Sequence, residues 1–273
     1  MYWQRLPLDA LKPKWVLDGF PKAGLHLLEQ MLCPVAKPQP ADAVCRDHWV
    51  GTFNGNAWTN EWLPLRTTTF RLARLTSGYY LKGHLGWRED LEQFLYLSGA
   101  AVVFVYRDPR DVAVSQAHHI LNPDDYHYQH PNKDVYRDLK TFDAALAAVI
   151  GGVGPYPGVM ERWALYAPWL DVEWALKLPF ETMRQEPLES ARMLLEYGLR
   201  RVTASIGIEI RLDPEEYEAT AAKMAEVSQQ TERSPNFRRG QVGGWRAVFT
   251  DEHVAAFRAH DVEGWVERLG YDW

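Results

Sequence analysis

Short apolar runs alternate along the chain with segments whose apolar residues recur at helical spacing. The clearest run is AVVFVY at 101–106, a β-branched and aromatic stretch typical of a strand covered on both faces. The segments WVLDG at 15–19, GYYLK at 78–82 and VEWALKL at 172–178 have the same character, so we expect strands there too. The strand at 101–106 is expected to be central in the sheet.

Helical spacing follows most of these runs. It predicts helices at 24–32, 88–98, 159–169, 187–199 and 215–227. Residues 34–74 have no clear period and are expected to be loops with short helices. Asp108 and Asp111 stand near the start of another helix, where carboxylates favour the positive end of the helix dipole. The alternation predicts an α/β fold, with residues 1–273 in a single domain and a central parallel sheet of four to five strands flanked by helices.

Composition narrows the function classes. Of the 273 residues, 47% are hydrophobic and 24% are charged, as in ordinary globular proteins. The net charge of −6 argues against binding to nucleic acid, because phosphate backbones attract basic surfaces. Cys33 and Cys45 are too few for a disulfide framework and lack zinc-site spacing, so we expect a reducing compartment and no structural metal. The chain has neither a secretory leader pattern nor a run of about 18 apolar residues, so we expect a cytoplasmic protein without a membrane anchor.

The segment DGFPKAGLHLL at 18–28 joins the first expected strand to its helix. It places Lys22 and Gly24 in a turn that would aim backbone N–H groups and a positive helix end at an anion. An ordinary strand-to-helix turn would have the same pattern. The spacing differs from the Gly-x-x-x-x-Gly-Lys-Ser/Thr of an ATP or GTP loop. A nucleotide that needs no Mg²⁺ ligand from the loop is therefore favoured.

The loop FPKAG at 20–24 resembles the YPKSG loop of sulfotransferases that use 3′-phosphoadenosine 5′-phosphosulfate (PAPS). In that family the loop holds the 5′-phosphosulfate and its lysine assists departure of the bridging oxygen. The resemblance implies these roles for Lys22, Ala23 and Gly24. It extends donor binding to Leu25 and His26, which stand where the family has threonines. The hydroxyl donors are missing there, so either His26 is the substitute donor or donor binding is weakened or altered.

The segment VYRDPRDVAVS at 105–115 resembles the family's RNPRDVAVS segment, which follows a central strand. In the family an arginine and a serine hold the 3′-phosphate of PAPS. The resemblance therefore implies that Arg107 and Ser115 bind this group. The alternative is a solvated ion cluster formed by the charged side chains between positions 107 and 111.

Two later segments complete the expected donor site. NFRRG at 236–240, with GGWR at 243–246 and FT at 249–250, resembles the family's RKGxxGDWKxxFT signature. That loop closes over the 3′-phosphate and adenine, which implies donor binding by Arg238, Arg239 and Gly240; a basic solvated loop is the alternative. LPFETM at 178–183 resembles a strand end whose aromatic residue contacts adenine, which implies that Phe180 stacks on this ring.

The segment LKGHL at 81–85 resembles the family's KTHLP, in which the histidine is the general base. This implies that His84 takes the acceptor proton and that Lys82 is a second cation near the sulfuryl oxygens. Gly83 replaces the threonine of the family. We expect His84 at a strand end beside those that carry Lys22 and Arg107, where open α/β sheets bind ligands.

These resemblances, from about Trp15 to Thr250, imply a PAPS-dependent sulfotransferase with a P-loop NTPase-like fold. PAPS is the expected co-substrate, without a metal, and the acceptor is a small molecule, aromatic or glycosidic, with a hydroxyl or amine. Its pocket wall is expected to include Trp58, Trp62, Trp87, His118, Tyr126 and Tyr128. The dimer segment of the family is only partly kept, which leaves the oligomeric state open. Two alternatives remain: a protein of this fold that binds a bisphosphate nucleotide without transfer, and a P-loop kinase.

Overall fold

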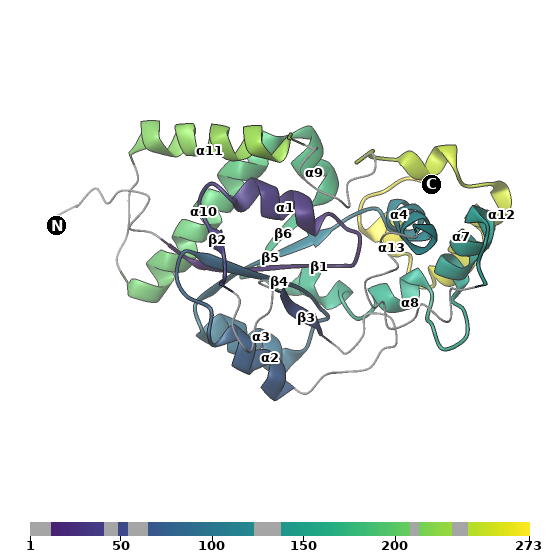
Figure 1. Cartoon of the computed structure of the whole chain (residues 1–273), viewed down its shortest axis with the longest axis horizontal. Coiled ribbons are helices and arrows are strands. Elements are labelled where there is room, and N and C mark those ends of the chain that lie inside the picture. Colours follow the sequence, from purple (N-terminus) through teal and green to yellow (C-terminus); the bar gives the residue numbers. More distant parts are fainter. Residues whose placement is uncertain (1–11, 41–48, 54–64, 123–137, 208–212, 231–239) are drawn as a thin grey trace.

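A parallel sheet lies at the centre of the molecule (Figure 1). The structure is a computed structural model and describes residues 12–40, 49–53, 65–122, 138–207, 213–230 and 240–273. The strands are β1 (Lys14–Gly19), β2 (Lys37–Pro38), β3 (Trp49–Phe53), β4 (Tyr79–Leu85), β5 (Ala100–Tyr106) and β6 (Leu176–Pro179). Their order is β2-β4-β1-β5-β6, and β3 also pairs with β4. Every one of these pairings is parallel, which confirms the expected α/β sheet.

The middle of the sheet differs from the expectation. β5 is an interior strand between β1 and β6, but β1 is the middle strand of the order. Both strands are almost completely buried, so their apolar runs do not show which of them is in the middle. The short strands β2 and β3 lie in the stretch at 34–74 that was expected to contain only loops and short helices. They have only two and five residues, too few for a periodic pattern to be recognised.

Helices cover both faces of the sheet and gather at one of its ends. They are α1 (Leu25–Leu32), α2 (Leu65–Leu72), α3 (Glu89–Leu97), α4 (Pro109–Leu121), α7 (Phe142–Gly151), α8 (Val159–Trp163), α9 (Phe180–Gln185), α10 (Pro187–Ile206), α11 (Pro214–Ser228), α12 (Asp251–His260) and α13 (Trp265–Arg268). Figure 1 shows α1, α10 and α11 on one face and α2 and α3 on the other. Helices α4, α7, α12 and α13 lie beyond the carboxyl ends of the strands, on the side where β1 turns back into α1 (Figure 1).

Local sequence explains several helix boundaries. The Asp108 carboxylate accepts the Arg110 N–H at 2.9 Å and caps α4, whose first residue is a proline. Thr250 and His253 form a reciprocal capping box at the start of α12. The single helix expected at 159–169 is interrupted: α8 ends at Trp163 and a 3₁₀ turn spans Ala167–Asp171. Pro168 lies at the start of that turn and has no N–H to continue an α-helix.

Candidate active site

Three neighbouring strand ends bring the expected site residues to one edge of the sheet. β1 lies between β4 and β5, so the loop after β1 has the end of β4 on one side and the end of β5 on the other. Lys22 is in this loop, His84 is near the end of β4, and Arg107 directly follows β5. The sheet therefore brings these three residues, which are far apart in sequence, to the ligand-binding edge of an open α/β fold.

The loop from Phe20 to Gly24 is tightly turned. The Phe20 N–H donates to the Val105 carbonyl at 3.3 Å, and the Ala23 N–H donates to the Phe20 carbonyl at 3.0 Å. Lys22 has φ 70°, the sole positive value among the non-glycine residues that the structure describes. This left-handed conformation costs free energy for a residue with a Cβ. The loop thus keeps a strained lysine three residues before the start of α1.

Gly24 directly precedes α1 as its N-cap residue and approaches the ring of Phe180 closely. Its φ is 111°, and a Cβ at this position would lie 2.4 Å from the Phe180 Cδ2 atom. A side chain therefore fits neither the backbone conformation nor the available space. The first backbone N–H groups of α1 follow this glycine directly, and a helix start of this kind is suited to binding an anion.

The ring of His84 is held by the backbone of the loop. Its Nδ1 lies 2.6 Å from the Gly19 carbonyl oxygen, which can only accept, so Nδ1 carries the proton in this contact. Burial lowers the pKa of His84 to about 4, and the positive charges of His26, Lys22 and Lys82 add to this effect. The imidazole is therefore neutral at pH 7, with Nε2 as the nitrogen that can accept a proton.

Lys82 and His26 both contact the same carboxylate on α1. The Lys82 Nζ lies 2.5 Å from the Glu29 Oε2, and the His26 Nδ1 lies 3.4 Å from it. Tyr80 donates to the other oxygen of Glu29 at 2.8 Å. The ion pair holds the Lys82 ammonium at α1. His26 is exposed, whereas the side chain of its neighbour Leu25 is buried in the core.

Arg107 is only partly engaged by the protein. Its Nη2 donates to the Gln241 carbonyl at 2.7 Å and lies 3.4 Å from the Asp111 Oδ2. Its Nε is buried and has no hydrogen-bond partner among the described residues. The guanidinium carbon lies 4.2 Å from the centre of the Phe180 ring. A buried donor without a partner is costly, so this arginine is suited to binding an anion.

Phe180, which was expected to stack on adenine, is packed between protein groups. Its ring lies against Gly24 and beneath the Arg107 guanidinium, and the residue is only 5% exposed. These contacts make Phe180 a support shared by the loop and the arginine. Ser115, the other residue expected at the 3′-phosphate, is partly buried within α4.

Asp111 connects α4 to the turn that follows Gly240. Its Oδ2 accepts the Gly243 N–H at 2.8 Å, and its Oδ1 accepts the Trp245 N–H at 2.8 Å. The same carboxylate contacts Arg107, so the glycine-rich turn is held beside the arginine at the end of β5. Gly240 has φ 55° and begins this described segment. Arg238 and Arg239, which were expected to bind the donor, lie outside the described residues.

The alternative of a solvated ion cluster is wrong for most of its members. Asp108, Arg110 and Asp111 are all buried. Two nitrogens of Arg110 donate to Asp108, at 2.9 and 2.8 Å, and a third donates to the Asp272 carbonyl at 2.8 Å. The Arg110 guanidinium carbon also lies 3.9 Å from the centre of the Trp245 ring and 4.9 Å from that of Trp273. This cluster forms the packed base under Arg107.

Asp18 is the polar residue at this edge that sequence patterns missed. It is fully buried near the end of β1 and accepts the N–H groups of Gly19 and Leu85, both at 2.7 Å. Burial raises the pKa of Asp18 well above its usual range, although the two backbone hydrogen bonds oppose this. In the sequence this residue resembles the polar end of an apolar strand. The one signal in the sequence for a role of Asp18 at the site was the presence of a carboxylate next to the Lys22 loop.

The expected acceptor wall is described only in part. The Trp87 indole donates to Glu92 at 2.7 Å, and the His118 ring centre lies 4.4 Å from that of Phe142. The other predicted wall residues lie outside the described part of the chain: Trp58, Trp62, Tyr126 and Tyr128.

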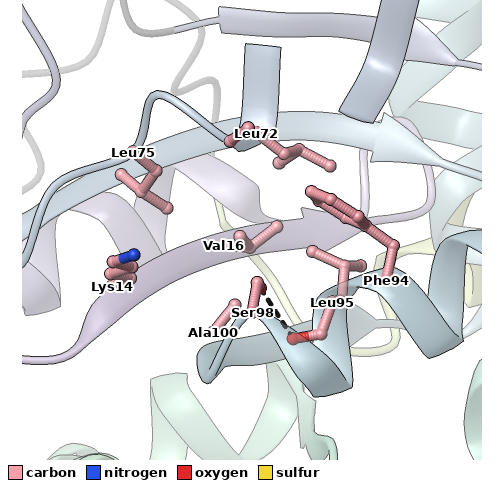
Figure 2. Close-up of a pocket in the computed structure, with 9 residues that line it drawn as sticks. Lys14, Val16, Leu72, Leu75, Phe94, Leu95, Ser98 and Ala100 are labelled. Atoms are coloured by element: carbon pink, nitrogen blue, oxygen red, sulfur yellow. Dashed lines mark hydrogen bonds between the residues drawn. The ribbon is translucent and has the colours of Figure 1, made fainter. Parts of the chain in front are cut away.

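A cavity of about 220 Å³ lies at the opposite ends of the strands, between the starts of β1 and β5 and residues at the ends of α2 and α3 (Figure 2). Figure 2 shows Val16, Leu72 and Phe94 pointing into it, with Lys14 at one side. Ser98 lines it too, but its hydroxyl donates to the Leu95 carbonyl at 2.8 Å. The lining is mostly apolar and includes the first residues of β1 and β5. This cavity is therefore separate from the loop of Lys22.

The comparisons with known proteins identify the family and the fold. The sulfotransferase domain family matches residues 12–263, and the chain belongs to this family. The fold is similar to that of mouse sulfotransferase SULT7A1 complexed with PAP: the TM-score is 0.54 at 20% identity, over 94% of this chain and 86% of the other.

Two structures of retinol dehydratase have the same fold. The complex with androsterone and the inactive cofactor PAP gives a TM-score of 0.55 at 13% identity, over 98% of this chain and 83% of that one. The complex with retinol and PAP gives 0.55 at 13% identity, over 96% and 84%. A search of curated proteins gave no significant match. Within the described residues, no helix is both long and apolar enough to span a membrane.

Proposed function

We propose that the chain transfers a sulfuryl group from PAPS to a hydroxyl or amine of a small-molecule acceptor. The observation that carries the proposal is the meeting of three strand ends: the strained Lys22 loop after β1, the oriented His84 on β4, and Arg107 after β5. Membership of the sulfotransferase family and the fold shared with PAP-bound proteins support the same donor.

The donor would lie across the carboxyl ends of β1 and β5. Lys22 and the N–H groups of Gly24, Leu25 and His26 would bind the 5′-phosphosulfate, and Ala23 would keep the loop turned around it through its N–H bond to the Phe20 carbonyl. His26 is exposed at the start of α1 and would replace the missing threonine hydroxyl there.

The 3′-phosphate would bind beside Arg107. The free Nε of this arginine fits such an anion, and the turn after Gly240 is fixed next to it by Asp111. We assign Arg238, Arg239 and Gly240 to the same phosphate, with Ser115 as a further donor. Phe180 would act by supporting the Arg107 guanidinium.

The proposed reaction uses His84 at the end of β4 and Lys22 after β1. His84 would take the acceptor proton on Nε2 as the acceptor atom forms its bond to sulfur. The bond between sulfur and the bridging oxygen breaks, and adenosine 3′,5′-bisphosphate leaves. Lys22 and the loop amides stabilise the negative charge that develops on this product. Lys82 would contribute a second positive charge from its position at Glu29.

Calorimetric titration with adenosine 3′,5′-bisphosphate tests the donor site, with adenosine 5′-monophosphate as the comparison ligand. We expect preference for the bisphosphate, and an Arg107→Ala variant should weaken its binding by about 1.5–3 kcal/mol, the contribution of a hydrogen bond to a charged group. Arg192→Ala is the matched control, since Arg192 of α10 pairs with Glu218 of α11 at the surface. Equal binding of the two nucleotides, or no effect of Arg107→Ala, would contradict the proposal.

A further inference from the structure

We propose that Asp18 is a positioning residue that fixes the His84–Leu85 peptide, and through it the His84 ring, beside the donor loop. The role of His84 as general base belongs to the proposed function, and this inference rests on it. Asp18 itself would touch neither donor nor acceptor.

The main-chain pairing of β1 with β4 ends just before Asp18. The last paired residues are Leu17 and Lys82, whereas β1 continues to pair with β5 as far as Gly19. At the point where the ladder stops, the Asp18 Oδ1 accepts the Leu85 N–H at 2.7 Å. A side-chain oxygen thus replaces the missing main-chain partner and keeps the end of β4 against β1.

The peptide that carries His84 is held from several sides. Asp18 accepts the N–H of Leu85, and the Tyr166 hydroxyl donates to the His84 carbonyl at 3.4 Å. The Trp169 indole donates to the Leu85 carbonyl at 2.7 Å. With the backbone fixed in this way, the Gly19 carbonyl can receive the His84 Nδ1–H at 2.6 Å, and Nε2 is then the ring nitrogen without a proton.

The chemistry of Asp18 fits an acceptor role. The side chain of Asp18 is 0% exposed to solvent, and no ion pair to it is found among the described residues. Its Oδ2 is buried without a hydrogen-bond partner in the described part of the chain. Burial raises the pKa of Asp18, and its two backbone hydrogen bonds oppose this shift. Only one oxygen is used, and an asparagine amide oxygen should replace it.

The experiment compares Asp18→Asn with Asp18→Leu. The first keeps an acceptor oxygen, and the second keeps a similar volume without one. The primary readout is the nitrogen NMR titration of His84, with the His84→Ala spectrum for assignment. We expect Asp18→Asn to retain the Nδ1–H tautomer and the low pKa, whereas Asp18→Leu should move the pKa toward about 6.5, the ordinary value for histidine.

Turnover supplies the second readout. Asp18→Leu should lower kcat by about tenfold or more with a much smaller change in the KM for the donor, because misplacing a catalytic group affects the chemical step. Asp261→Leu is the matched control, since Asp261 is also buried and accepts two backbone N–H groups, from Trp265 and Val266. It should lower thermal stability and leave the His84 titration unchanged. If Asp18→Leu does not fold, Asp18→Ala, which also lacks an acceptor oxygen, takes its place.

The outcomes separate the two proposals. An Asp18→Leu protein with the wild-type His84 tautomer, pKa and kcat would overturn the positioning role, and so would an Asp18→Asn protein that behaves like Asp18→Leu. A His84→Ala protein with full turnover would instead remove the general base from the proposed function. The NMR titration is independent of turnover, so it tests the placement of His84 in either case.

Discussion

At the level of single residues, two features of the site are unusual for their residue types. Lys22 adopts a left-handed backbone conformation, and His84 has its pKa lowered to about 4. The first costs stability, and the second keeps a histidine neutral well below neutral pH. Both features make sense where a lysine must reach the leaving group and a histidine must accept a proton.

The strain at Lys22 predicts a separation of stability from activity. We expect Lys22→Gly and Lys22→Ala to lose turnover alike, since both remove the ammonium. Lys22→Gly should nevertheless be more stable than Lys22→Ala by about 1 kcal/mol, because glycine adopts φ 70° without a Cβ penalty. Chemical denaturation of the two variants measures the difference. Equal stabilities would show that the loop relaxes when lysine is removed.

The lowered pKa of His84 predicts the pH dependence of the reaction. We expect kcat/KM to stay level below pH 6.5 and to fall only as the pH approaches about 4. The free energy of unfolding should also depend on His84. Between pH 6.5 and about 4 the unfolded state binds a proton at this histidine more readily than the folded state does, so the contribution of His84 to stability is lost as the pH falls. Denaturation of the wild type and His84→Gln over this range isolates the effect. A fall in kcat/KM that begins near pH 6.5 would contradict this pH prediction.

At the level of elements, the site depends on two connections between segments that are far apart in sequence. Asp111 on α4 holds the turn that contains Gly243 and Trp245, and Glu29 on α1 holds Lys82 of β4. The first keeps the glycine-rich turn near the end of β5. The second keeps a lysine near α1.

Asp111 offers a test of the first connection. Asp111→Asn keeps one acceptor oxygen but turns an amide N–H₂ toward a backbone N–H. We expect a loss of about 1–3 kcal/mol in stability and a weaker affinity for adenosine 3′,5′-bisphosphate. Asp251→Asn is the control, because Asp251 is exposed in the first turn of α12. An Asp111→Asn protein with unchanged affinity for the bisphosphate would show that the glycine-rich turn does not contribute to donor binding.

Sequence patterns could predict some of these elements and not others. The runs at 15–19 and 101–106 are long and continuously apolar, so β1 and β5 were recognisable, and the order of strand ends then placed Lys22, His84 and Arg107 together. β2 and β3 are too short for a pattern. The pairing of Lys82 with Glu29 joins residues 53 positions apart, and no local rule reveals such a contact.

At the level of the whole molecule, the C-terminal residues pack against the base of the donor site. The Tyr271 hydroxyl donates to Glu181 at 2.9 Å, and Glu181 also accepts the Asp108 N–H at 3.0 Å. Arg110 binds the Asp272 carbonyl and lies near the Trp273 ring. The last three residues therefore brace the segment that carries Arg107.

Removal of residues 271–273 tests this coupling. We expect a lower melting temperature together with weaker binding of adenosine 3′,5′-bisphosphate, because the buried Arg110 loses a carbonyl and an aromatic partner. Arg268→Ala is the control, since Arg268 is exposed in the same region and stacks on Trp265. A truncated protein with unchanged affinity would show that the C-terminus contributes to stability alone.

The most direct test of the account is transfer of labelled sulfate from PAPS to a panel of phenol, sugar, lipid, peptide and amine acceptors. We predict a labelled product with at least one class, and a loss of about 10²–10⁴-fold in His84→Ala with donor binding retained. No product with any acceptor, in a protein that still binds adenosine 3′,5′-bisphosphate, would contradict the account and indicate a nucleotide-binding protein without transfer activity.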